Sequence, residues 1–201
     1  MRKPINIVLF LAITIFVGCS KETLKPSELI NWVNDSENGL IQKQIINDFD
    51  FEVLYKPTDY VIALEGRTDQ LTEEAYSELK SSVGEMQYLD LKIKSAAENT
   101  DALSGAIKSQ DDYYERLDYF VTYAYQDIQL VQGEDTLSPL IYHFERTYGL
   151  TPYNTILLGF EKTESPGDRT LIIDDQVLGI GRVKFVFDEE KINETPTLKR
   201  I

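Results

Sequence analysis

Cysteine and histidine are almost absent from this sequence of 201 residues, which contains one of each, Cys19 and His143. A single cysteine allows no disulfide within the chain, so a buried core must hold the folded domain together. Zinc sites normally draw on several cysteine and histidine ligands, which this chain does not offer. Its N-terminal apolar stretch, Ile5–Val17, is shorter than the roughly 20 residues that a membrane-spanning helix needs.

Positive charge is also scarce, because 20 lysines and arginines stand against 34 aspartates and glutamates, a net charge of -14. Binding to a phosphate backbone depends on clustered lysine and arginine, so the composition argues against a nucleic-acid partner. High acidity favours a protein that stays soluble and monomeric after export.

The first residues follow a recognisable order. Arg2 and Lys3 precede the apolar stretch, which ends in Phe16-Val17-Gly18-Cys19. This segment resembles a bacterial lipoprotein signal peptide with its lipobox. The resemblance implies cleavage before Cys19, acylation of its thiol and amine by fatty acids such as palmitate, and anchoring to a membrane. An ordinary secretory signal or a buried cysteine are the alternative interpretations.

Cleavage there defines the expected organisation: signal peptide 1–18, lipidated tether 19–26 and one β-rich α+β domain 27–201. The mature chain loses two of its 20 basic residues and none of its 34 acidic ones, so its net charge becomes -16. Attraction to an anionic lipid surface is therefore not expected, and the acyl groups must supply the attachment.

Hydrophobic periodicity predicts the elements of the first half of the domain. Helices are expected at 27–34, 72–83 and 111–124, each beginning near a residue that caps helices. Strands are expected at 40–46, 48–55 and 89–93, and the continuous apolar run Tyr60–Leu64 is predicted to be a central strand.

From Asp127 onward the pattern is β throughout. The expected strands are 127–131, 140–147, 154–161, 169–173 and 176–188, separated by turn-forming residues. The predicted fold class is α+β, mainly β, with antiparallel sheets and two or three helices packed on one side. A sandwich-like C-terminal half, in the manner of an immunoglobulin domain, remains an open alternative.

His143 is the first candidate for a general base, because this role near neutral pH usually falls to a histidine. On a strand it shares a face with Ile141 and Glu145. A hydrolase using His143, or a carboxylate pair such as Glu145 with a distant aspartate, is the remote alternative. A surface histidine on an edge strand is the simpler interpretation, because no motif of a known hydrolase accompanies it.

Carboxylate groups are the other chemistry to consider. Calcium binds carboxylates and carbonyls, and the acidic groups to consider are Asp111-Asp112, Asp174-Asp175 and Asp188-Glu189-Glu190. None matches the spaced acidic loop of a calcium site, so turns and helix caps are expected instead, and no metal or cofactor is predicted. Gly179-Ile180-Gly181 lacks the rest of a phosphate loop and is interpreted as a bulge or bend.

Aromatic residues crowd the segment 113–125. Exposed tyrosines make good platforms for sugars or peptides, so Tyr114, Tyr119 and Tyr123 are the candidate ligand-binding residues. Packing against a core or a sheet edge is the simpler interpretation of the same rings.

Two stretches, Tyr55–Tyr60 and His143–Leu150, resemble segments of uncharacterised envelope lipoproteins of the Bacteroidota. The resemblance implies a Gram-negative envelope and an outer-membrane anchor, because Ser20 stands where an aspartate would retain the protein at the inner membrane. Lys21-Glu22 matches a surface-export signal only in part, so the periplasmic and surface faces both remain open. The leading hypothesis is a non-enzymatic module that binds another envelope component. The alternative is a lipoprotein that binds a glycan or a small ligand through its tyrosine-rich surface, so the expected partner is an envelope protein or a glycan.

Overall fold

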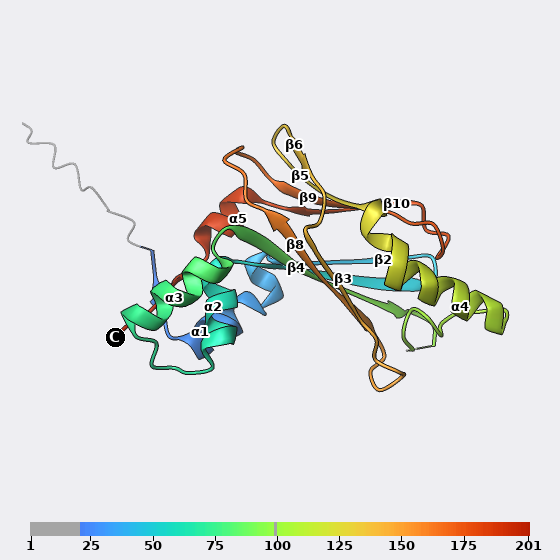
Figure 1. Ribbon diagram of the computed structural model, residues 1–201, viewed down its shortest axis with the longest axis horizontal. Coiled ribbons are helices and arrows are strands. Elements are labelled where there is room, and N and C mark those ends of the chain that lie inside the picture. Colours follow the sequence, from blue (N-terminus) through green and yellow to red (C-terminus); the bar gives the residue numbers. More distant parts are fainter. Residues whose placement is uncertain (1–20, 99) are drawn as a thin grey trace, which may run out of the picture.

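The computed structural model describes residues 21–98 and 100–201 (Figure 1). Cys19, the expected signal peptide 1–18 and the beginning of the expected tether 19–26 lie outside the described residues. The helical elements are α1 (Pro26–Val33), η1 (Ser36–Asn38), α2 (Thr58–Gly66), α3 (Glu73–Val83), α4 (Gln110–Asp118), the π-helical turn η2 (Tyr119–Tyr123), η3 (Ala124–Asp127) and α5 (Glu189–Glu194). The strands are β1 (Thr23–Leu24), β2 (Ile41–Ile46), β3 (Phe49–Lys56), β4 (Met86–Ser95), β5 (Ile128–Gln132), β6 (Asp135–Leu137), β7 (Ile141–Glu145), β8 (Asn154–Glu161), β9 (Arg169–Asp174), β10 (Arg182–Phe187) and β11 (Thr197–Leu198).

Two antiparallel sheets form the body of the domain. One has five strands in the order β2-β3-β4-β8-β7, and the other has four in the order β10-β9-β5-β6. They pack face to face through aromatic side chains, with ring centroids 6.2 Å apart for Phe51 and Phe185 and 5.8 Å apart for Tyr55 and Phe187. The predicted fold class, α+β and mainly β, is confirmed. Because β2, β3 and β4 belong to the sandwich, it is not confined to the C-terminal half.

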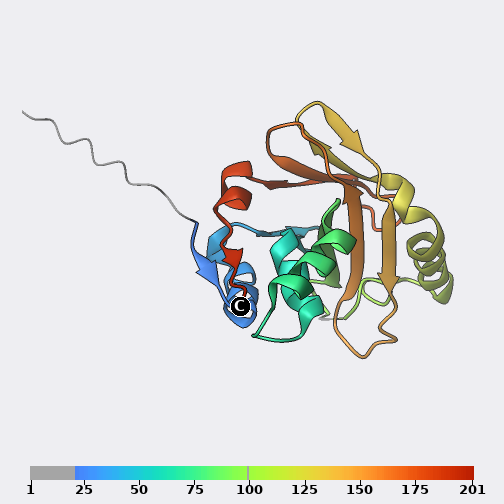
Figure 2. The same cartoon turned by 60° about the vertical axis from the view of Figure 1, so that its left-hand side comes forward.

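Helices cover the sandwich at two places (Figures 1 and 2). The first three, α1, α2 and α3, gather at the end where β3 leads into α2 and α3 leads into β4. Helix α4 and the η2 turn lie at the other end, where the Phe120 ring stacks on Phe144 with centroids 5.4 Å apart. The sequence predicted that the helices pack on one side of the sheets. They lie instead at opposite ends of the sheets.

The prediction that Tyr60–Leu64 is a strand is wrong, because this run lies inside α2. Four consecutive residues, Tyr60 to Ala63, are buried, so the apolar pattern has no exposed face and shows no helical period. A short run buried on all sides cannot be assigned to a helix or a strand from periodicity alone. The helix begins directly after Pro57, which stands at its N-cap.

The C-terminal third departs from the prediction of uninterrupted β structure in two places. The expected strand 176–188 is β10 only from Arg182 onward, because residues 175–181 form a turn around the Asp175 carboxylate. That carboxylate accepts hydrogen bonds from the backbone N–H groups of Val177, Leu178 and Ile180. The expected bend at Gly179 is part of this turn, with φ at +71°. After β10, Asp188 caps helix α5, which the sequence pattern did not indicate.

The two ends of the described chain meet. β1 pairs in parallel with β11, Thr23 opposite Thr197 and Leu24 opposite Leu198. Leu198 is buried, and its N–H donates to the Asp59 carboxylate over 2.8 Å. The C-terminal residues therefore hold Thr23 and Leu24, which belong to the expected tether 19–26, against the helical end of the domain.

Candidate functional site

The outer face of the five-stranded sheet, which points away from the second sheet, carries a ladder of opposite charges. Side chains along β3 and β4 alternate between the two faces. Buried residues point toward the second sheet, while Asp50 and Glu52 in β3 and Lys92 and Lys94 in β4 point outward. The strand register places Asp50 opposite Lys94 and Glu52 opposite Lys92, the arrangement in which cross-strand ion pairs form.

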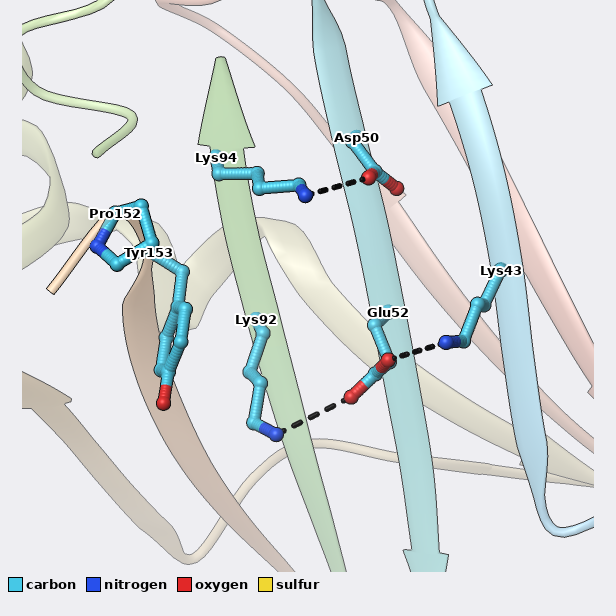
Figure 3. A pocket seen from close by; sticks show the side chains of 7 residues that line it. All are labelled: Lys43, Asp50, Glu52, Lys92, Lys94, Pro152 and Tyr153. Carbon is cyan, nitrogen blue, oxygen red and sulfur yellow. Dashed lines mark hydrogen bonds and ion pairs between the residues drawn. The ribbon is translucent and has the colours of Figure 1, made fainter. Parts of the chain in front are cut away.

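This ladder forms the floor of a groove of about 340 Å³, a volume at the lower end of the range of about 300–1,000 Å³ for small-molecule sites. We call it the outer groove. Figure 3 shows its lining: Lys43, Asp50, Glu52, Lys92, Lys94, Pro152 and Tyr153. Helices α1, α2 and α3 do not cover this part of the sheet. The Lys92 and Lys94 side chains are 38 % and 37 % exposed, which shows that the groove is open to solvent.

Three ammonium groups share two carboxylates in the outer groove. Glu52 accepts from Lys43 Nζ over 2.8 Å and from Lys92 Nζ over 3.2 Å. The Lys94 ammonium lies 3.3 Å from Asp50. The lining thus carries one more positive than negative charge, in a chain whose net charge is -14.

The ion pair between Lys43 and Glu52 stabilises the charged forms of both side chains. Burial alone would raise the pKa of Glu52, but hydrogen bonds from Lys43 and Lys92 outweigh burial and lower this pKa. The hydrogen bond to Glu52 and the attraction of its charge raise the pKa of Lys43. Both partners therefore stay ionised over a wider pH range than they would in the unfolded chain.

Tyr153 forms one wall of the outer groove, just before β8 begins. Its ring lies beside Lys92, whose Nζ atom is 5.3 Å from the ring centroid, within reach of a cation–π interaction. The β4–β8 register, which places Ile93 opposite Asn154, brings Tyr153 next to Lys94 as well. The groove thus combines ammonium groups, carboxylates and one aromatic face.

A second hollow, of about 400 Å³, lies beside the buried Arg116. The Arg116 guanidinium donates to two backbone carbonyl oxygens and lies 5.3 Å from the Phe49 ring centroid. Burial lowers its pKa. The lining of this hollow includes three carboxylates and two basic side chains, those of Lys108 and Arg116. It therefore carries one more negative than positive charge, the reverse of the outer groove.

The structure separates the three tyrosines that the sequence proposed as a ligand surface. Tyr119 is 8 % exposed, and its hydroxyl donates to the Asp127 carboxylate over 3.0 Å. Tyr114 and Tyr123 are 55 % and 50 % exposed. Tyr119 offers no surface to a ligand because its ring belongs to the buried core, and neither of the other two tyrosines lines the outer groove.

His143 and Glu145 lie on β7, an edge strand of the five-stranded sheet, and both are exposed. They point to the same face as the outer groove, since the register places His143 opposite Leu157 and Glu145 opposite Thr155. Tyr142 and Phe144 point inward, as the alternation predicted. The placement of His143 is that of a surface residue on an edge strand.

The acidic groups considered for calcium are used in local structure. Asp112 accepts from the N-cap hydroxyl of Ser109 over 2.7 Å. Asp174 pairs with Arg182, while Asp175 organises its turn and Asp188 caps α5. Among residues 21–98 and 100–201, no group of three or more histidine, cysteine or acidic side chains is placed to hold a metal ion.

Sequence reasoning did not find the outer groove, although one signal was present. Asp50 and Glu52, at outward positions of β3, are acidic, and Lys92 and Lys94, at outward positions of β4, are basic, which would favour pairing of these two strands. Tyr153 gave no such signal, because its position depends on how β8 is placed beside β4. Within the part of the chain that the structure describes, no helix is long and apolar enough to cross a membrane.

Comparisons with known proteins add little to this picture. No family model matches the chain, and no curated protein matches it. A crystal structure of a protein of unknown function from Burkholderia pseudomallei K96243 aligns over 84 % of this chain and 86 % of its own, with 9 % sequence identity and a TM-score of 0.38.

Proposed function

We propose that this chain is a lipid-anchored protein of the bacterial envelope and that its domain is a non-enzymatic binding module. The anchor is supported by the sequence around Cys19, which resembles a lipobox, and the outer membrane by the resemblance to envelope lipoproteins of the Bacteroidota. The binding role is supported by one observation, the outer groove. The groove has the volume of a small-molecule site, and its charged floor and aromatic wall offer a ligand both ionic and apolar contacts.

The anchor is tested by membrane fractionation and by labelling with a radioactive fatty acid. Wild-type protein is expected in the membrane fraction with label on Cys19, and Cys19→Ala is expected to lose both. Label-free wild-type protein in the soluble fraction contradicts the anchor. Protease treatment of intact and lysed cells then distinguishes the surface face from the periplasmic face.

The contact surface is tested with a photoreactive amino acid introduced at Ile45, which is 70 % exposed and lies across from Asp50 beside the groove. The matched control carries the same probe at Val186, which is 49 % exposed and belongs to the other sheet. After illumination of intact envelopes, mass spectrometry is expected to find a defined adduct at position 45 and none at position 186. Equal labelling of both positions, or no adduct at position 45, contradicts a binding role for this face.

A further inference from the structure

We infer that the ligand of the outer groove is a sugar that carries a carboxylate, such as a uronic acid unit of a glycan. This inference deepens the proposed function and rests on it. It is drawn from the charge balance of the groove, its aromatic wall and its position over central strands.

The charge balance favours an anion. Glu52 engages both Lys43 and Lys92, and Asp50 engages Lys94, so the three ammonium groups exceed the two carboxylates by one charge. The side chains of Lys92 and Lys94 are more than a third exposed. They project from positions two residues apart on one face of β4, about 6–7 Å along the strand. A carboxylate placed between them would accept from both.

The aromatic wall favours a sugar ring over a simple anion. Tyr153 lies beside Lys92, whose Nζ atom is 5.3 Å from the ring centroid, and lines the same groove as Lys94, so a group held at Lys92 would contact the Tyr153 ring. Rings of this kind combine an apolar face with a polar tip. The face suits the C–H groups of a pyranose ring, and acetate or phosphate has no group to place there.

The position of the groove disfavours a peptide bound by strand addition. Its floor is made by β3 and β4, each of which is paired on both sides, so their backbone N–H and C=O groups already serve the sheet. A ligand in the groove therefore meets side chains only. Asp50 and Glu52 supply acceptors and the lysines supply donors, a mixture that suits the hydroxyl groups of a sugar.

The experiment compares two disaccharides of similar size. The full chain, purified in a nonionic detergent, is titrated calorimetrically with digalacturonate and with the neutral galactobiose. We expect digalacturonate to bind at least about tenfold more tightly, because one of its two carboxylates forms charge-assisted hydrogen bonds with lysine. Its affinity is expected to fall as salt is raised, since these charges are partly exposed.

Substitutions test the contributions of the lysines and of the aromatic wall separately. Lys94→Gln is expected to reduce the affinity for digalacturonate about tenfold without changing that for galactobiose, while Tyr153→Ala reduces both. Matched controls are Lys184→Gln, an exposed lysine on the second sheet, and Tyr114→Ala, an exposed tyrosine outside the groove. Neither control is expected to change either affinity.

Several results would overturn the inference: no binding of digalacturonate, equal binding of both sugars, or unchanged affinity in Tyr153→Ala. Competition by acetate, inorganic phosphate or a polyglutamate peptide at the concentration of the acidic sugar would also overturn it. If the probe at position 45 still captures an adduct while digalacturonate fails to bind, the inference fails and the proposed function stands. If both experiments fail, the binding role of the groove is lost as well.

Discussion

Replacing Phe185 by alanine tests the packing of the two sheets. Phe185 is fully buried, and its ring centroid lies 6.2 Å from that of Phe51 in the facing sheet. A buried Phe→Ala substitution removes apolar contact and leaves a cavity, at a cost of about 3–5 kcal/mol. Because whole domains are stable by only about 5–15 kcal/mol, we expect Phe185→Ala to lose a large part of the free energy of unfolding.

The adjacent residue supplies the control. Val186 lies on the same strand but points to the other face, and it is 49 % exposed, so Val186→Ala should change the free energy of unfolding by no more than about 0.5 kcal/mol. A double-mutant cycle of Phe51→Leu and Phe185→Leu should give a coupling energy of about 0.5–1.5 kcal/mol, the usual value for an aromatic pair.

The assay is urea unfolding in a Cys19→Ala background, which removes any lipid. Circular dichroism reports the sheets, and the fluorescence of Trp32, the single tryptophan, reports α1. Coincident transitions justify a two-state analysis. A loss in Phe185→Ala of less than about 1 kcal/mol, or one equal to that in Val186→Ala, would refute the face-to-face packing.

Three further predictions concern polar groups. NMR titration should place the pKa of Glu52 below 4.5, the value of an unperturbed glutamate, and Lys43→Gln should raise this pKa. Because folding lowers the pKa of Glu52, the stability that this ion pair supplies is fully present above 4.5, the pKa of the unfolded chain, and is lost as the pH falls through the folded-state pKa. An unchanged Glu52 pKa in Lys43→Gln would contradict the ion pair. Arg116→Leu should lower the free energy of unfolding by about 1–3 kcal/mol in urea denaturation, because two buried carbonyl oxygens lose their donor; a neutral result would mean that water reaches them. Tyr119→Phe should cost about 0.5–1.5 kcal/mol in the same assay through the lost hydrogen bond to Asp127, and a cost near zero would mean that this bond does not stabilise the domain.

Strands with strict alternation were predictable from the sequence. In β4 every second residue from Gln87 to Ser95 is buried, so the period of two is complete and the predicted strand falls within the observed one. Helix α3 was predictable for a different reason. Its N-cap is Thr72, whose hydroxyl accepts from the N–H of Ala75, and residues of this type at a helix start leave a local signal.

Elements whose character depends on their neighbours were not predictable. Helix α2 has four consecutive buried residues, so its hydrophobic pattern shows no helical period. The turn 175–181 depends on how one carboxylate, that of Asp175, gathers several backbone N–H groups. The outer groove joins residues from three strands and a loop, so local patterns indicated which side chains point outward but not which strands are adjacent.

The pairing of β1 with β11 has a consequence for the order of folding. Residues 197–198 are synthesised long after residues 23–24, so the first strand must wait for nearly the whole domain before its partner exists. A contact between such distant residues carries a large closure entropy and forms late. The pairing of Thr23 and Leu24 therefore belongs to the final stage of folding, and a chain interrupted before Thr197 would leave β1 without its partner strand.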